Sequence, residues 1–145
     1  MFKKILVPTD GSALAQRAAT TAADLAKAHG GQVIGVYVID PFPYIGIGEA
    51  SAVGLQAYIA EARNVAGQAL EALGKVCASA GAPFAGDTIE RNVVYEGVIE
   101  TAQAEGCDLI VMASHGRQGV KALVLGSVAQ KVLTHTRLPV LIVKD

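Results

Sequence analysis

The sequence predicts an α/β protein with one parallel β-sheet that is covered by helices on both faces. Short runs of apolar and β-branched residues alternate along the chain with longer segments whose apolar residues recur every three or four positions. Most of the short runs are continuously apolar, which is typical of strands buried on both faces. Regular alternation of such strands with helices implies right-handed crossovers and a parallel sheet.

The first strand is predicted over Lys3 to Pro8, a continuous apolar run after two lysines. A helix follows from Ser12, a residue type favoured at helix N-caps, until Gly30 stops the periodic pattern. The second strand covers Val33 to Ile39. Residues 41 to 55 then contain two prolines and three glycines. We expect a long loop there, which either forms a partial lid over a site or is an inert crossover.

Tyr58 to Ala80 is predicted to be a long amphipathic helix, which Gly81 ends. Phe84 to Arg91 mixes polar and apolar residues, as in a strand with one face or edge near water. The next helix covers Val94 to Glu105. The remaining predicted elements are a strand over Asp108 to Ala113, the loop Ser114-His115-Gly116-Arg117-Gln118-Gly119, an apolar segment over Val120 to Leu125, a helix over Ser127 to His135 and a strand over Leu138 to Lys144.

Glycines punctuate the loop after the fourth predicted strand. Gly116 and Gly119 flank the basic Arg117, and Gly126-Ser127 stands at the start of the last helix. Glycines let the backbone approach a ligand closely, and a helix N-terminus presents N–H groups to an anion. This pattern suits a phosphate.

The whole chain resembles the universal stress protein family. The opening KKILVPTDGS, the loop SHGRQG, the helix start LGSVAQKVL and the closing LPVLIVK stand where that family has them. The spacing A-x2-G-x9-G-S from Ala113 through Gly116 to Gly126-Ser127 is similar to the family's nucleotide motif G-x2-G-x9-G-[ST]. Ala113 replaces the first motif glycine. The resemblance implies one Rossmann-like domain over residues 1 to 145 with the sheet order 3-2-1-4-5.

In such a sheet, ligands bind beyond the carboxyl ends of the strands where the order reverses, here between strands one and four. The resemblance implies that the ligand is ATP, with Mg²⁺ or Mn²⁺. It assigns adenine to Val38, ribose to Asp10 and Ala113, and the phosphates to Gly116, Gly126, Ser127 and Val128. The full set of expected binding residues is Pro8, Thr9, Asp10, Val38, Met112, Ala113, His115, Gly116, Arg117, Gly126, Ser127 and Val128.

Several of these residues have an alternative, purely structural interpretation. Asp10 could close a turn or cap the first helix. Ser127 forms a capping-box pattern with Gln130 and would be useful at a helix start without any ligand. His115 and Arg117 are either solvated loop residues or phosphate contacts, and the guanidinium fork of arginine fits phosphate better.

Ala113 leaves two possibilities open. A methyl group pressed against a ligand could cost on the order of 1–3 kcal/mol. If the backbone has ordinary strand geometry and the side chain points aside, the cost vanishes.

Composition narrows the function classes. A net charge of −1 gives no general attraction for nucleic acid or anionic lipid. No apolar run reaches the ~20 residues of a membrane span, and no secretory signal is visible, so we expect a cytoplasmic protein. Cys77 and Cys107 lack metal-ligand spacing and are interpreted as small core residues.

The sequence therefore predicts an ATP-binding universal stress protein that acts as a nucleotide-dependent switch in stress response. Without a P-loop or a positioned nucleophile, we expect at most slow ATP hydrolysis and assign no catalytic residue. The alternative is a dimeric interaction module that does not bind nucleotide. The family typically pairs the closing strand, Leu138 to Val143, with that of a second copy, which implies a homodimer.

Overall fold

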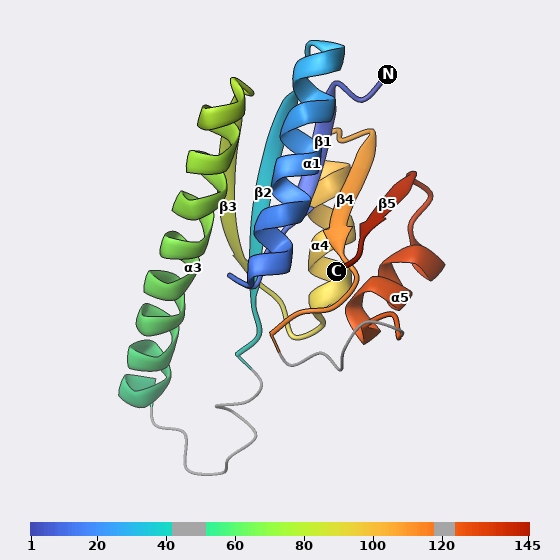
Figure 1. Ribbon diagram of the computed structural model, residues 1–145. Helices are drawn as coiled ribbons and strands as arrows, with labels where there is room; N and C mark the ends of the chain where they lie inside the picture. The colour runs from blue at the N-terminus through green and yellow to red at the C-terminus, as the bar shows by residue number, and fades with distance from the viewer. Residues whose placement is uncertain (42–51, 118–123) are drawn as a thin grey trace.

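The computed structural model describes residues 1–41, 52–117 and 124–145, and its elements follow the predicted order (Figure 1). The strands are β1 (Lys4–Pro8), β2 (Gln32–Ile39), β3 (Phe84–Glu90), β4 (Leu109–Ala113) and β5 (Val140–Val143). The helices are α1 (Ala13–His29), α3 (Ala52–Ala80), α4 (Val94–Ala104) and α5 (Ser127–His135).

All strand pairs are parallel, and the sheet order is β3-β2-β1-β4-β5. This confirms the α/β class and the expected order 3-2-1-4-5. The central strand β1 carries Ile5, Leu6 and Val7, each with 0% exposure, which explains its continuous apolar run. The strand order reverses between β1 and β4. Because these two strands are parallel neighbours, their carboxyl ends lie side by side at the same end of the sheet.

Side-chain alternation along the buried strands builds one core on each face of the sheet. Val7 and Val111 pack with the buried alanines of α1 and with residues of α3. Leu6 and Met112 pack with α4 and α5 on the opposite face. Figure 1 shows the same division, with α1 and α3 in one layer and α4 and α5 in the other.

Both ends of α1 agree with the sequence prediction. Ser12 is the N-cap, and its hydroxyl oxygen accepts the N–H of Ala15 at 3.2 Å. Gly30 adopts a left-handed conformation with φ 66°, which glycine takes without steric cost. The N–H of Gly31 then donates to the carbonyl of Ala26 at 2.7 Å and completes the C-cap.

Two predicted boundaries are wrong. α3 begins at Ala52 rather than Tyr58, because a single glycine at position 54 costs a helix only about 1 kcal/mol. β5 begins at Val140 rather than Leu138, because the Leu138 N–H donates to Thr136 Oγ1 at 3.1 Å and proline at 139 has no N–H. The other boundaries agree within one residue.

The loop predicted over residues 41 to 55 falls mainly on positions 42–51, and the segment Val120 to Leu125 mainly on positions 118–123. Both stretches lie outside the described residues, so the lid remains a prediction. Both cysteines are buried as expected. Within the described ranges, no helix is long and apolar enough to cross a membrane.

Candidate functional site

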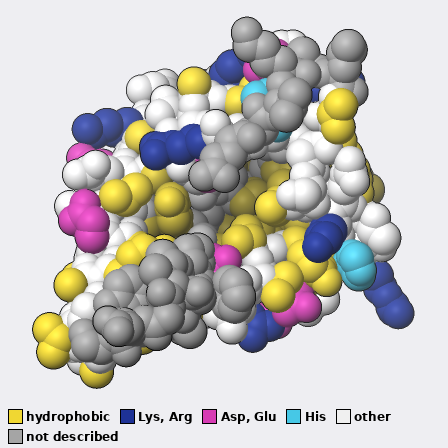
Figure 2. All heavy atoms as spheres, turned by 90° about the horizontal axis from the view of Figure 1, so that it is seen from below, with side chains coloured by type: hydrophobic (Ala, Val, Ile, Leu, Met, Phe, Trp, Pro, Cys, Tyr) yellow, Lys and Arg dark blue, Asp and Glu magenta, His cyan; other side chains and the backbone are white. Residues whose placement is uncertain are grey.

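A cavity of about 590 Å³ opens at the carboxyl ends of β1 and β4. Figure 2 looks onto this end of the molecule and shows a hollow with hydrophobic side chains at its floor. All of the binding residues expected from the sequence line this cavity. The further lining residues, which the sequence did not single out, are Ala15, Val36, Tyr37, Val94, Val98, Ser114 and Ala129.

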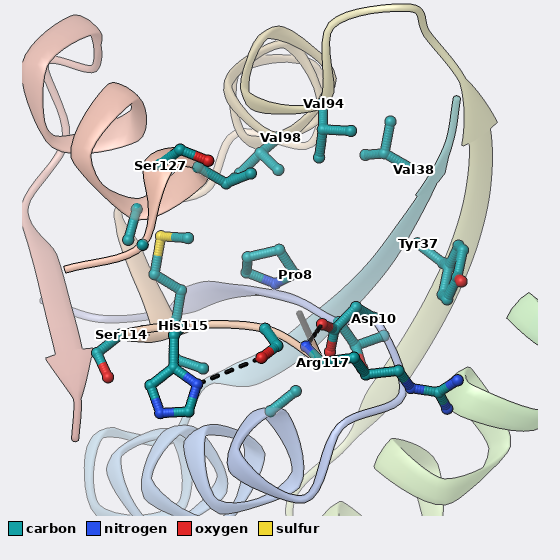
Figure 3. A pocket seen from close by; sticks show the side chains of 18 of the residues that line it. Pro8, Asp10, Tyr37, Val38, Val94, Val98, Ser114, His115, Arg117 and Ser127 are labelled. Atoms are coloured by element: carbon teal, nitrogen blue, oxygen red, sulfur yellow. Dashed lines mark hydrogen bonds between the residues drawn. The ribbon is translucent and has the colours of Figure 1, made fainter. Parts of the chain in front are cut away.

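One end of the cavity is an apolar wall made by β2 and α4. Val38 from β2 and Val94 and Val98 from α4 point toward the same space (Figure 3). α4 packs closely on the sheet there, since a Cβ added at Gly97 would lie 3.0 Å from Val38 Cγ1. The sequence had placed Val98 only within the predicted helix from Val94 to Glu105. Its spacing of four residues from Val94, on one helix face, is the signal that could have identified the wall.

The peptide group of Val38 also faces the cavity. Even-numbered residues of β2 turn their N–H and C=O groups toward β1: Gln32 N–H donates to the Lys3 carbonyl, and the Val36 carbonyl accepts the Thr9 N–H, both at 2.9 Å. Val38 continues this series, but β1 has ended at Pro8. One donor and one acceptor therefore open into the space beyond the end of β1.

The N-terminus of α5 forms the other end of the cavity. The N-cap is Gly126, in an extended conformation, and its carbonyl accepts the Gln130 N–H at 2.9 Å. The N–H groups of Ser127, Val128 and Ala129 precede this first intrahelical bond and have no acceptor within the helix. Three N–H donors therefore face the cavity, where an anion can accept their hydrogen bonds.

The capping-box interpretation of Ser127 is wrong. Ser127 is the first residue inside α5, so it does not occupy the N-cap position, and the N-cap residue Gly126 has no side chain to cap the helix. The Gln130 side chain instead donates from Nε2 to the carbonyl of Leu125 at 2.8 Å. The Ser127 hydroxyl therefore has no capping role, and Figure 3 shows it above the cavity.

Asp10 joins the turn after β1 to the loop after β4. Its Oδ1 accepts the Ser12 N–H at 2.9 Å, and its Oδ2 accepts the Arg117 N–H at 2.7 Å. Burial alone raises the pKa of this carboxyl, but the bonds from Ser12 and Arg117 outweigh it and leave the pKa below its usual value. The turn-closing interpretation of Asp10 is thereby confirmed, while the N-cap of α1 is Ser12.

Close packing inside the loop explains both remaining motif glycines. A Cβ at Gly116 would overlap Asp10 Oδ2. A Cβ at Gly126 would lie 3.0 Å from the Ser114 carbonyl oxygen and 3.2 Å from His115 Cα. The Gly126 N–H also donates to that Ser114 carbonyl at 2.6 Å. A side chain at position 116 would thus displace Asp10, and one at position 126 would press on Ser114 and His115, in both cases without any ligand.

The comparison with known proteins decides the family. The model of the universal stress protein family matches residues 1–144. The chain belongs to the universal stress protein family.

Relatives and solved structures agree with this assignment. The chain is 35% identical over 145 residues to the universal stress protein MJ0531 of Methanocaldococcus jannaschii, with 99% of this chain and 83% of the relative covered. It is 31% identical over 160 residues to MJ0577 of the same organism, with 99% and 96% covered. The solved structure of MJ0577 has a TM-score of 0.85 at 29% identity and covers 100% of this chain and 97% of that chain.

A universal stress protein of Archaeoglobus fulgidus, solved in complex with dAMP, has a TM-score of 0.68. The two chains are 23% identical, and the alignment covers 99% of this chain and 100% of that chain. At this identity the likeness shows the shared fold alone.

In this universal stress protein, Ala113 has regular strand geometry. It is the last residue of β4 and is paired with Val143. Alternation places its side chain on the α1 face with Val111, opposite to Met112, which packs on the α4 face. The methyl group therefore points away from the apolar wall, although Ala113 still lines the cavity, so its effect on a ligand stays a prediction.

The two basic loop residues have intramolecular partners. Arg117 Nη2 lies 3.4 Å from the Gly11 carbonyl oxygen, and Figure 3 shows its guanidinium pointing away from Ser127. His115 Nε2 lies 3.1 Å from Asp145 Oδ2, and its Nδ1 lies 3.3 Å from the Gly116 carbonyl. These bonds raise the pKa of His115 above its usual value.

A metal site among the described residues would need several ligating side chains close together. No group of three His, Cys, Asp or Glu residues that could hold an ion occurs in the described part of the chain. Asp10 contributes a carboxylate to the cavity lining, and each of its oxygens already accepts one N–H. These residues do not make a metal site on their own.

Proposed function

We propose that this universal stress protein binds an adenine nucleotide, with ATP as the favoured ligand, in the cavity at the ends of β1 and β4. One observation carries the proposal: a single cavity joins an apolar wall with an open peptide group to the N-terminal N–H groups of α5. The wall suits a flat base, and the N–H groups suit phosphate. Its volume falls within the roughly 300–1,000 Å³ of small-molecule sites.

The Val38 peptide supports adenine over guanine. Adenine presents an amino donor next to a ring-nitrogen acceptor, which complements a carbonyl and an N–H from one residue. Guanine presents an acceptor next to a donor at the same positions, so both pairs would be mismatched. Buried unmatched groups cost about 1–3 kcal/mol each, which predicts a preference for ATP over GTP of tenfold or more.

Binding requires several contacts to act together. A helix N-terminus contributes roughly 0.3–1 kcal/mol to an exposed charge, whereas micromolar affinity requires about 8 kcal/mol. The apolar wall, the Val38 peptide, the α5 N–H groups and the Ser127 hydroxyl would share this free energy. Asp10 is also compatible with ribose, because each carboxylate oxygen has a second lone pair.

The further steps of the proposal are a regulatory switch and slow hydrolysis. Occupancy would bias the loop after β4, which also contacts the residues after β5. Hydrolysis would be slow because the lowered pKa of Asp10 makes its carboxylate a weak general base toward water.

The experiment is nucleotide analysis of the purified protein. The protein is denatured, released nucleotides are identified by chromatography, and ATP and GTP are titrated calorimetrically with Mg²⁺ or Mn²⁺ present. Release of an adenine nucleotide, or ATP binding that is tighter than GTP binding, is expected. Absence of both retained and added adenine nucleotide would overturn the proposal.

A second candidate function is a dimeric interaction module without nucleotide. The internal packing of Gly116 and Gly126 favours it, because retention of these glycines does not require a ligand. Replacing Val94 by tryptophan would fill the part of the cavity next to the apolar wall, and its effect on binding and assembly would distinguish the two functions. A pure module should keep its partners and assembly, whereas a nucleotide-dependent switch should lose ATP binding and regulation.

We also propose a homodimer through the closing strand, Leu138 to Val143. β5 is an edge strand, and the backbone N–H and C=O groups of every second residue point away from β4. Leu141 is 39% exposed on it. An apolar edge of this kind is stabilised when a second copy covers it.

A further inference from the structure

The two loops that frame the cavity are joined through one side chain. Asp10 lies in the turn after β1, and its Oδ2 accepts the N–H of Arg117 in the loop after β4 at 2.7 Å. Its Oδ1 accepts the N–H of Ser12 at 2.9 Å and fixes the carboxylate at the start of α1. Figure 3 shows Asp10 and Arg117 in contact at the cavity rim.

Gly116 packs directly against this carboxylate. A Cβ at position 116 would overlap Asp10 Oδ2, the same atom that accepts the Arg117 N–H. The φ of Gly116 lies outside the left-handed region, so alanine would be tolerated there if the carboxylate were absent. Residue 116 is therefore restricted to glycine by Asp10 rather than by its own backbone conformation.

Ser114, at the start of this loop, is bonded to the N-terminus of α5, which we call the anion end of the cavity. Ser114 N–H donates to the Val143 carbonyl at 2.9 Å, and the Ser114 carbonyl accepts the Gly126 N–H at 2.6 Å. Gly126 is the N-cap of α5. A displacement of residues 116 and 117 would therefore be transmitted to the N–H groups that face the cavity.

We propose that Asp10 is a positioning residue: its carboxylate holds the Gly116–Arg117 peptide at the cavity rim and thereby sets the shape of the anion end. This inference rests on the proposed nucleotide binding and adds a role that a ribose contact would not supply. Asp10 and Gly116 then act as one unit. If Asp10 acted only through the ribose, its removal would weaken ATP binding without changing the protection of the Arg117 N–H.

A double-mutant cycle tests this coupling. Affinity for ATP is measured calorimetrically for the wild type, Asp10→Ala, Gly116→Ala and the double variant. In the presence of Asp10, Gly116→Ala should weaken binding roughly tenfold or more; in the Asp10→Ala background the same substitution should change it by less than about threefold. Equal effects in both backgrounds would overturn the inference.

Two control variants accompany the cycle. Gly67→Ala places a methyl group where no described atom lies within 4 Å, so it should leave ATP affinity unchanged. Asp10→Asn keeps the shape of the side chain, so Gly116→Ala should remain damaging in that background. If Gly116→Ala is harmless in the Asp10→Asn background, the steric coupling is refuted.

A readout without ligand separates the two proposals. Amide hydrogen exchange of Arg117 should be slow in the wild type and faster by roughly tenfold or more in Asp10→Ala. If the wild type fails to bind ATP, the proposed function fails, while the exchange rate of the Arg117 N–H still tests the positioning role of Asp10. If the wild type binds ATP but Arg117 exchanges equally fast in both proteins, the positioning role fails alone.

Discussion

The imidazole of His115 and the carboxylate of Asp145 meet at 3.1 Å. This contact joins the loop after β4 to the residues that follow β5, the proposed dimer strand. The two segments are also connected through the backbone, since Ser114 N–H donates to the Val143 carbonyl. The cavity rim and the sheet edge therefore share one set of contacts, through which the proposed nucleotide would act on the proposed dimer.

The first prediction concerns the pH dependence of this pair. The bond to Asp145 and the bond to the Gly116 carbonyl raise the pKa of His115. A raised pKa means that the folded protein favours the protonated imidazole of His115. The pair therefore contributes fully to the free energy of unfolding below the pKa that His115 has in the unfolded chain. This contribution is lost as the pH rises through the pKa of His115 in the folded protein. Asp145→Asn should lower the His115 pKa in an NMR titration. An unchanged titration curve would show that the pair does not form in solution.

The second prediction concerns Ser127. Its hydroxyl does not cap α5, so Ser127→Ala should change the free energy of unfolding by less than about 0.5 kcal/mol. A hydrogen bond to a charged phosphate contributes about 1.5–3 kcal/mol, so ATP affinity should fall by roughly tenfold or more. Calorimetry and urea unfolding measure the two effects. Thr134→Ala, on the same helix, is the matched control and should not affect ATP binding.

The third prediction concerns assembly. Leu141→Lys should produce monomers in light scattering, because a charge replaces an apolar side chain at the sheet edge. Val140 and Ile142 are less suitable probes, since both pack partly against the core of their own subunit. Val53→Lys, at a position 77% exposed on α3, is the control. A dimer that survives Leu141→Lys would argue against this interface.

The fourth prediction concerns Gly126. Gly126→Val should destabilise the protein by about 1–3 kcal/mol even without nucleotide, because its side chain would press on Ser114 and His115. Urea unfolding of the ligand-free protein measures this. Loss of ATP binding in this variant would therefore not identify a phosphate contact. Wild-type stability in Gly126→Val would mean that the loop can relax.

The fifth prediction concerns the thiols. Burial raises the pKa of Cys77 and of Cys107 to about 11. At neutral pH both should remain thiols and react with an aromatic disulfide reagent only after unfolding, because the thiolate is the reactive form. Rapid labelling of the native protein would contradict the core assignment of that cysteine.

Local sequence patterns were sufficient to predict the secondary structure and its order. Strand and helix patterns depend on residues a few positions apart, so the ends of α1 at Ser12 and Gly30 followed from them directly. Resemblance to the family added the sheet order and the residues around the cavity. Local signals failed at the starts of α3 and β5. They also failed in the role of Ser127, where the capping pattern was present but Gly126 took the N-cap position.

Tertiary structure decided how those residues act on one another. Asp10 and Arg117 are separated by 107 positions in the chain and meet only because β1 and β4 are neighbours in the sheet. The direction of the Val38 peptide depends on where β1 ends, and the need for glycine at position 116 depends on a carboxylate from another loop. Periodicity and spacing record what each segment prefers. Register and packing between segments determine which groups face the cavity, and these are properties of the folded chain.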